Sequence, residues 1–354
     1  MGYAIRLVLI VMVIVSLEAI SNVEAYGPLK MDITKLPEWQ MKNSSLGGKL
    51  LLSDSPEMVE SNGILYQDKV EGNVRLFFYH VNASTAAKKM EVVLENSGHE
   101  IAHINVSQSS LGGPGYDWFA VGKETQRAYL SGKSSYQISI PPGGKMPLST
   151  NISDTAVLPN MLIHGIYDFT VDHQINVKVM MLPLFEEDAK VSQAAKVILP
   201  ADQWHLRGTF EGANRKLSSV HAYDPVLYGA VAITLADNEV DPFLQGIDAM
   251  DGKKVVNYGN YGVVYQIIPP GKNGRKISYY LSPRGGNYAG VIGINHPEVY
   301  WSPLATPGDK IYFGDDKQKD ISFLGTYDSS ESLSFIFSPP GASNLPVKIV
   351  VLAE

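Results

Sequence analysis

The chain has 354 residues, a formal net charge of −7 and no cysteine. The absence of cysteine excludes disulfides, thiolate metal sites and thiol nucleophiles, so the apolar core alone must stabilise the fold. The acidic balance, without any block of basic residues, argues against binding to nucleic acid or to an anionic membrane surface.

The first 25 residues have the parts of a secretory signal peptide. Arg6 is the only charged residue among the first seventeen, and the apolar run Leu7–Val15 follows it. Val23 and Ala25 provide the small residues that a signal peptidase reads, which predicts cleavage before Tyr26. The run is shorter than the roughly 20 residues that span a bilayer, and the alternative is a buried N-terminal helix. We expect a secreted, extracellular protein associated with the cell envelope, with no transmembrane segment in the mature chain. An exported chain without cysteine suggests a Gram-positive source.

After the signal peptide, most of the chain has the pattern of short strands separated by turns. Runs of five to eight residues, rich in β-branched and aromatic side chains, are separated by pairs of strong turn formers such as Asn273-Gly274. These runs are Val74–Val81, Lys89–Glu95, Ile101–Val106, Tyr167–Val171, Val177–Leu182, Val263–Ile268, Ile277–Leu281, Leu333–Phe337 and Val347–Leu352. Only Glu186–Val197 has a helical pattern. We predict an all-β fold of two β-sandwich domains, immunoglobulin-like or jelly-roll-like, with one short linker helix.

Weak internal similarity suggests where the domains lie. Val177–Leu182 matches Val347–Leu352 most closely, and shorter matches keep their order along both halves. Two diverged copies of one sandwich would produce this pattern, and so would chance recurrence of Gly- and Val-rich strings. On the duplication hypothesis, residues 26–45 form an N-terminal leader, 46–185 the first domain, 186–204 a helical linker and 205–354 the second domain.

The string His99-Glu100-Ile101-Ala102-His103 matches the H-E-x-x-H zinc-protease pattern. That pattern binds zinc only on a helix, where positions i and i+4 share one face. Here a turn precedes it, and alternation follows it, which predicts a hairpin of strands Glu91–Glu95 and Ile101–Val106. On a strand the two histidines would lie roughly 13 Å apart. We therefore predict no metal site, no cofactor and no catalytic residue.

Aromatic side chains beside glycine-rich segments are the candidate binding residues. Leu111–Gly115 precedes one group, and Ser282–Gly286 lies near the other. We expect both segments to be loops. Rings on such loops either recognise a ligand or fold back to cap the core, and both alternatives stay open. The candidates are Tyr116, Trp118, Phe119, Tyr288, Tyr300 and Trp301.

Several segments resemble a group of exported Gram-positive proteins that are labelled as carrying a copper amine oxidase N-terminal domain. They are Gly63–Tyr66, Gly72, Arg75–Phe78, Leu111–Gly115, Arg207–Phe210, Tyr258–Tyr265, Ser282–Gly290 and Ser338–Leu352. The small module that gives the label its name is absent. The oxidase centre is absent too, because Asn257-Tyr258 is followed by Gly259 and no H-x-H pair occurs. The resemblance therefore implies an envelope or secreted protein and gives no support for an oxidase.

Together these patterns favour a non-enzymatic structural or binding protein that recognises wall polysaccharide or an envelope partner protein. The alternative is a secreted enzyme acting on polysaccharide, a glycosidase or lyase, because paired carboxylates leave no reliable sequence motif. A cleft that holds two carboxyl groups would favour the enzyme.

Overall fold

A computed structural model describes residues 31–132, 134–185, 188–271 and 274–353. The predicted signal peptide lies outside these residues. Asp32–Glu354 forms one compact unit. No helix among the described residues is long and apolar enough to cross a membrane.

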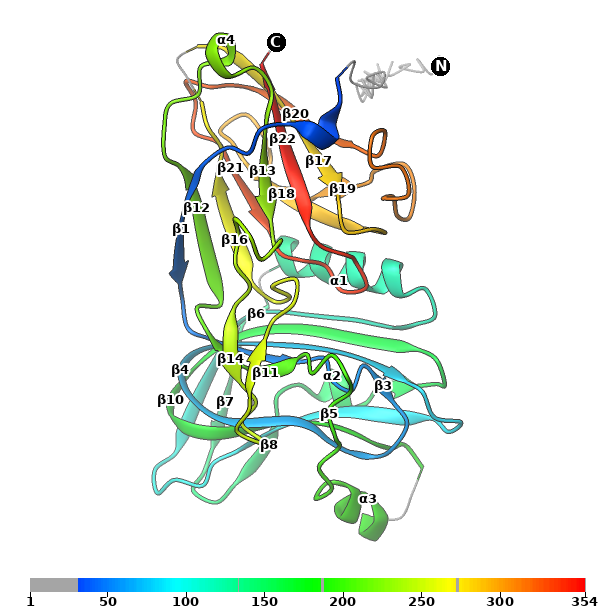
Figure 1. The fold of residues 1–354 in the computed structure, drawn as a ribbon. Coiled ribbons are helices and arrows are strands. Elements are labelled where there is room, and N and C mark those ends of the chain that lie inside the picture. Colours follow the sequence, from blue (N-terminus) through cyan, green and yellow to red (C-terminus); the bar gives the residue numbers. More distant parts are fainter. Residues whose placement is uncertain (1–30, 133, 186–187, 272–273, 354) are drawn as a thin grey trace, which may run out of the picture. The chain divides into compact units, whose positions relative to one another are not determined.

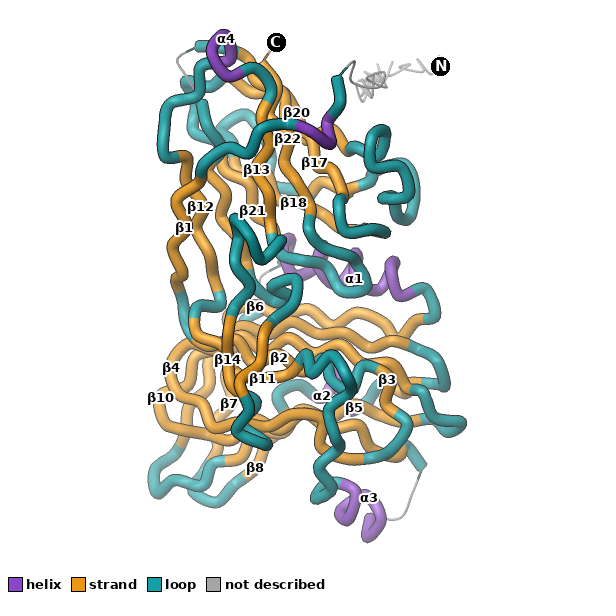
Figure 2. The backbone as a smooth tube through the Cα atoms, in the orientation of Figure 1, coloured by secondary structure: helices purple, strands orange, loops and turns teal. Residues whose placement is uncertain are grey.

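The all-β prediction is confirmed. Strands make up 49% of the structure and helices 9%, and Figure 2 shows how strongly strands dominate the described chain. The strands form three sheets, of twelve, six and four strands.

The largest sheet is built around two long antiparallel strands, β4 and β10 (Figure 1). Its path runs β15-β14-β11-β2-β4-β10-β5-β8, with four further strands paired beside it. The members are β2 (Lys49–Ser53), β3 (Met58–Val59), β4 (Gly63–Asn82), β5 (Lys88–Glu95), β6 (Ala102–Gly115), β7 (Tyr136–Ile140), β8 (Lys145–Pro147), β9 (Ala156–Val157), β10 (Leu162–Pro183), β11 (Arg207–Glu211), β14 (Gln245–Ile247) and β15 (Lys254–Val256).

Two smaller sheets contain the remaining strands. The six-stranded sheet, in order along the sheet, consists of β1 (Met41–Leu46), β12 (Asn214–Ser219), β16 (Val264–Ile268), β21 (Ser334–Phe337), β18 (Gly290–Asn295) and β19 (Leu304–Thr306). The four-stranded sheet consists of β13 (Val231–Leu235), β22 (Val347–Ala353), β17 (Lys276–Pro283) and β20 (Ser322–Asp328).

The core lies on both faces of the large sheet. Adjacent residues of β4 point to opposite faces, so Phe77 joins one buried apolar cluster and Phe78 joins another. The Phe77 cluster also contains apolar residues of the two smaller sheets, such as Tyr265 and Val351. This explains why every residue of β4 from Val74 to Asn82 is buried, without alternation.

Strand pairing interleaves the two halves of the chain. The large sheet is extended beside β2 by three strands of the second half of the chain, β11, β14 and β15. Conversely, β1 of the first half pairs with β12 of the second half in the six-stranded sheet. The chain passes from β1 to β2 at Gly47, which has a φ of +84°, and at Gly48, where any side chain would overlap the Asn73 carbonyl oxygen. The expected boundary at residue 205 does not separate the sheets, because strands beyond it hydrogen-bond to the first half. The division into two domains and the duplication stay predictions.

Four α-helices occur among the described residues, where one was predicted. The predicted linker helix is present as α3 (Asp188–Ala194). The others are α1 (Trp118–Ser131), α2 (Thr150–Ser153) and α4 (Pro225–Tyr228), and a short 3₁₀ turn covers Ile33–Lys35. The Asp117 side chain caps α1 by accepting a hydrogen bond from the Ala120 amide.

α1 connects two sheets. It contacts β6 and β10 of the large sheet and β18 of the six-stranded sheet. Lys123 donates to the Pro307 carbonyl at 2.7 Å, and the Gln126 amide oxygen accepts from the Val291 amide at 2.7 Å. The expectation that Leu111–Gly115 is a loop was wrong, because these residues form the end of β6, and α1 begins shortly after them. Of the second expected loop, Ser282 and Pro283 belong to β17, and residues 284–286 lie outside the strands.

The expected hairpin around His99 was also wrong. β5 and β6 are strands, but they do not pair with each other. β5 pairs with Asn176–Pro183, and β6 pairs with Leu162–Val171, along the same edge of β10. β10 has 22 residues, which is long enough to take both partners in succession.

Candidate functional site

The candidate site begins with the loop Ser53–Glu57, which leaves the end of β2. His80 of β4 holds this loop at two points. Its Nδ1 lies 2.9 Å from the Pro56 carbonyl oxygen and must therefore donate, so its Nε2 accepts from the Ser53 hydroxyl at 2.8 Å. Burial lowers the pKa of His80 to about 4, which keeps the ring neutral and this pattern of donors intact.

A second anchor comes from Asp202, far along the sequence. Its carboxylate accepts from the Ser55 hydroxyl and from the Glu57 amide, both at 2.9 Å. The loop is therefore held on both sides, and the side chains of Asp54 and Glu57 have fixed positions.

Asp54 is the unusual member of this loop. Its side chain is only 9% exposed, and its Oδ1 has no hydrogen-bond partner among the described residues. Burial raises its pKa well above the usual range, and the neighbouring carboxyl groups of Glu57 and Asp202 raise it further. The pKa of Glu57 is raised as well, by burial and by Asp202.

Aromatic rings form the walls around these two carboxyl groups. We call the resulting pocket the Asp54 cleft; it has a volume of about 260 Å³. It is lined by Asp54, Glu57, Phe77, Tyr79, Trp118, Phe119, Leu206, Tyr261 and residues 341–344.

Three of these rings are each fixed by a separate contact. The Trp118 indole N–H donates to the Asn160 carbonyl at 3.2 Å, and Phe119 stacks on Tyr312 with ring centroids 4.8 Å apart. The Tyr261 hydroxyl donates to the Ser343 carbonyl at 2.6 Å. The pocket is therefore formed before any ligand binds.

Electrostatics link the two tyrosines to the carboxyl groups. The pKa values of Tyr79 and Tyr261 are raised by burial first, and then by the charges of Asp54 and Glu57. Both phenols are therefore protonated at neutral pH. The cleft combines flat rings with several groups able to exchange hydrogen bonds, which is the usual composition of a site for a small polar ligand.

The six binding residues expected from the sequence do not form one surface. Trp118 and Phe119 line the Asp54 cleft, but from the first turn of α1 rather than from a loop. Tyr116 is 63% exposed and does not line the cleft. Tyr288 has no exposed area and packs on Phe313, so it belongs to the core and not to a recognition surface.

Tyr300 and Trp301 lie apart from the cleft. Tyr300 is 92% exposed. Trp301 is 39% exposed, lies over Gly293, and donates its indole N–H to the Leu130 carbonyl at 3.1 Å. The structure thus supports the capping alternative for Tyr288 and, in part, for Trp301.

The histidines of the H-E-x-x-H string are not brought together with other ligands. His103 is exposed on β6, and its Nδ1 lies 3.1 Å from the Ser139 hydroxyl, while His99 lies in the preceding bend. Neither belongs to the two groups of His, Asp and Glu among the described residues whose ligand atoms lie within 4.8 Å of one another. The prediction that they bind no zinc stays a prediction.

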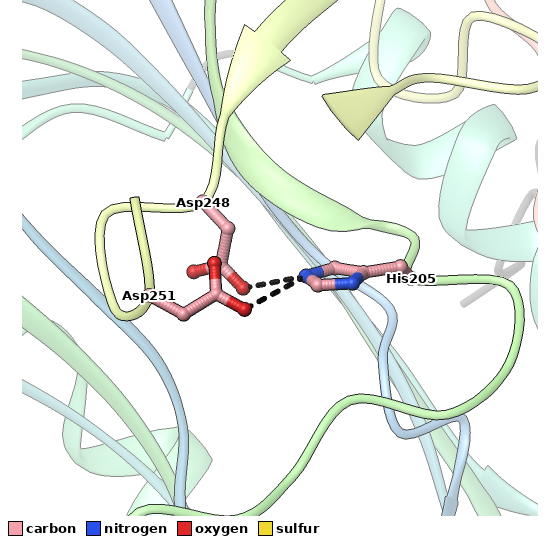
Figure 3. A group of neighbouring side chains, drawn as sticks. All are labelled: His205, Asp248 and Asp251. Atoms are coloured by element: carbon pink, nitrogen blue, oxygen red, sulfur yellow. Dashed lines mark hydrogen bonds and ion pairs between the residues drawn. The ribbon is translucent and has the colours of Figure 1, made fainter. Parts of the chain in front are cut away.

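One of those groups is His205, Asp248 and Asp251, which Figure 3 shows with both carboxylates directed at the imidazole. His205 Nε2 lies 2.8 Å from Asp248 Oδ2, and Arg207 donates to the same oxygen at 2.7 Å. The Met250 amide donates to the other oxygen at 2.9 Å. Asp248 is therefore already neutralised, and the guanidinium would repel a metal ion. This arrangement fits a structural ion-pair network.

The second group is His296, Glu298 and Glu331. His296 Nδ1 accepts from the Glu298 amide at 3.2 Å, so the proton sits on Nε2, which lies 2.8 Å from a Glu331 oxygen. Nδ1 is therefore in use, whereas Nε2 lies at ion-pair distance from Glu331 without a hydrogen bond of good geometry.

Comparisons with known proteins add little. No protein-family model and no curated protein matches the chain. A solved xanthan lyase from Paenibacillus is 8% identical over 92% of this chain and 27% of its own, with a TM-score of 0.17. The 7S globulin of Momordica charantia is 8% identical over 81% of this chain and 78% of its own, with a TM-score of 0.13. The chain spans about a quarter of the lyase, and such TM-scores support no argument. Nothing found names a copper amine oxidase N-terminal domain, so that resemblance stays a prediction.

Proposed function

We propose that the chain is an exported, envelope-associated binding protein whose Asp54 cleft takes one sugar unit of an extracellular polysaccharide. The observation that supports this most is the convergence of Trp118, Phe119 and Tyr261 on two carboxyl groups in a single pocket. Sugar rings stack on aromatic faces, while carboxyl and phenol groups exchange hydrogen bonds with sugar hydroxyls. A volume of about 260 Å³ lies just below the usual range for small-molecule sites, which suits one monosaccharide.

A wall-polysaccharide pull-down with two matched tryptophan variants tests this function. Trp118→Ala should weaken binding at least tenfold, because it removes one wall of the cleft. Trp204→Ala is the control, since Trp204 is 64% exposed and lines a different pocket, beside His205. Equal binding by wild type and Trp118→Ala, or a selective loss in Trp204→Ala, would place the site elsewhere.

The second candidate is an enzyme acting on polysaccharide. Asp54 and Glu57 supply it with two carboxyl groups in one cleft, and the raised pKa of Asp54 suits a general acid. Release of reducing ends or unsaturated products from wall polysaccharide, abolished in Asp54→Asn, would support the enzyme. Binding without product would support the binding protein.

A further inference from the structure

The Asp54 cleft has carboxyl groups without a matching cation. Asp54 and Glu57 line it, Asp202 lies behind them, and no basic side chain of the described residues is among its lining. Elsewhere in the fold, buried carboxylates have a guanidinium partner: Asp248 pairs with Arg207, and Asp241 with Arg215. The cleft therefore lacks a positive charge that comparable sites in the same chain contain.

One carboxyl oxygen of Asp54 also lacks a hydrogen-bond partner among the described residues. Asp54 Oδ1 is buried without a hydrogen-bond partner, although Ser53, Ser55 and the Glu57 amide around it all have partners. A buried acceptor left unpaired costs about 1–3 kcal/mol. A donor on a bound ligand would remove that cost.

The rings favour a cation over a neutral donor. The faces of Trp and Tyr attract a positive charge within about 6 Å of the ring centroid, and this attraction grows when water is excluded. Tyr79 is only 4% exposed, and Trp118 and Tyr261 are each partly buried, so the walls exclude much of the solvent. Carboxyl groups and aromatic rings in one pocket are the composition of an ammonium-binding cage.

We infer that the Asp54 cleft binds the ammonium group of an unacetylated amino sugar within the polysaccharide. This inference rests on the proposed function and specifies its ligand. The ammonium group donates to the carboxyl groups of Asp54 and Glu57, while the sugar ring lies against Trp118. An N-acetyl group would remove the positive charge and place a methyl group against the carboxyl groups.

Binding is then coupled to proton release. The groups that face Asp54 are Glu57, Asp202, Tyr79 and Tyr261, none of them cationic, so the empty cleft favours a protonated Asp54. A bound cation stabilises the ionised carboxylate and expels that proton. Calorimetry in two buffers of different ionisation enthalpy, repeated over a series of pH values, should detect a net release of up to about one proton per site.

The test compares two trisaccharide probes by calorimetry: a glucosamine trimer and its fully N-acetylated counterpart. The glucosamine trimer should bind about 10–100-fold more tightly, as one ammonium–carboxylate contact would produce. Asp54→Asn keeps the shape of the side chain and should abolish this preference and the proton release. Glu57→Gln should reduce the preference. Glu71→Gln, an exposed change on the same strand as Tyr79, is the charge-matched control and should change nothing.

Three outcomes of the trimer experiment would count against the ammonium inference. If both trimers bind equally, and Trp118→Ala weakens both, the cleft binds sugars and the ammonium inference is overturned. If neither trimer binds, the ammonium inference is overturned, and the wall-polysaccharide pull-down decides the proposed function separately. If the preference survives Asp54→Asn and Glu57→Gln but disappears at high salt, the glucosamine trimer binds through diffuse surface charge, which also overturns the inference.

Discussion

Breaking the ion pair between Arg75 and Asp168 should destabilise the whole unit. Arg75 is 5% exposed and donates two hydrogen bonds to the Asp168 carboxylate, of 2.7 and 2.8 Å. Its third nitrogen, Nη1, donates to the carbonyls of Ala213 and Gly262, and Tyr129 of α1 donates to Asp168 at 2.8 Å. One guanidinium thus links β4, β10, α1 and two segments of the second half.

The expected magnitudes follow from what each substitution leaves unpaired. Removing one partner of a fully buried pair costs about 3–5 kcal/mol, and since Asp168 is 23% exposed we expect about 3 kcal/mol for Asp168→Asn. Arg75→Met should cost more, because two buried carbonyls also lose their donor. Tyr129→Phe removes one hydrogen bond to a charged group and should cost about 2 kcal/mol.

Urea unfolding at pH 7, followed by tryptophan fluorescence, measures these differences. Glu124→Gln is the control, because it breaks the exposed Arg127–Glu124 pair and should cost less than about 0.5 kcal/mol. A combined Arg75→Met and Asp168→Leu variant should be less destabilised than the sum of its single changes. If Asp168→Asn unfolds within 0.5 kcal/mol of wild type, the reasoning from burial is refuted.

Three further predictions concern the core, acid stability and export. Trp301→Ala should lower the free energy of unfolding by about 2 kcal/mol without affecting glycan binding, because its ring packs on Gly293; a binding defect alone would contradict this. Burial lowers the pKa of both His80 and His164 to about 4. Below pH 6.5 the unfolded chain therefore binds protons that the folded chain does not, so these two groups lower stability as pH falls from 6.5 toward 4, by at most about 3 kcal/mol each. Melting curves of wild type and His164→Asn should show a shallower pH dependence in the variant. Terminal sequencing of the secreted protein should begin at Tyr26, and an intact Met1 in the cytosol would contradict export.

The strands were predictable because their signal is local. Runs such as Val74–Val81 and Val347–Leu352 have β-branched and aromatic side chains between turn formers, and both lie in strands. α1 was missed although Asp117 is a good N-cap. Gly122 weakens its helical pattern, and the structure explains that glycine, because any side chain there would overlap the Gly341 carbonyl. A contact more than two hundred residues away is not visible in local periodicity.

The site was only half predictable for the same reason. Trp118 and Phe119 drew attention as rings beside glycine, whereas Asp54 and Glu57 sit in Ser53-Asp54-Ser55-Pro56-Glu57, which reads as an ordinary solvated turn. Asp54 is buried because Tyr79, Tyr261 and residues 341–344, which are distant in the sequence, line the same pocket. The two carboxyl groups become distinctive only in three dimensions.

The interleaved strand order also limits how this protein can be divided for experiments. A fragment that stops at residue 185 lacks β11, so β2 becomes a bare sheet edge carrying Leu50, Leu51 and Leu52, all fully buried in the whole chain. An apolar edge of that kind is a template for pairing with other copies, and the fragment should aggregate. The same fragment lacks Ala213 and Gly262, so Arg75 loses its carbonyl acceptors. Useful truncations are therefore confined to the ends of the chain, and any tag or reporter belongs there.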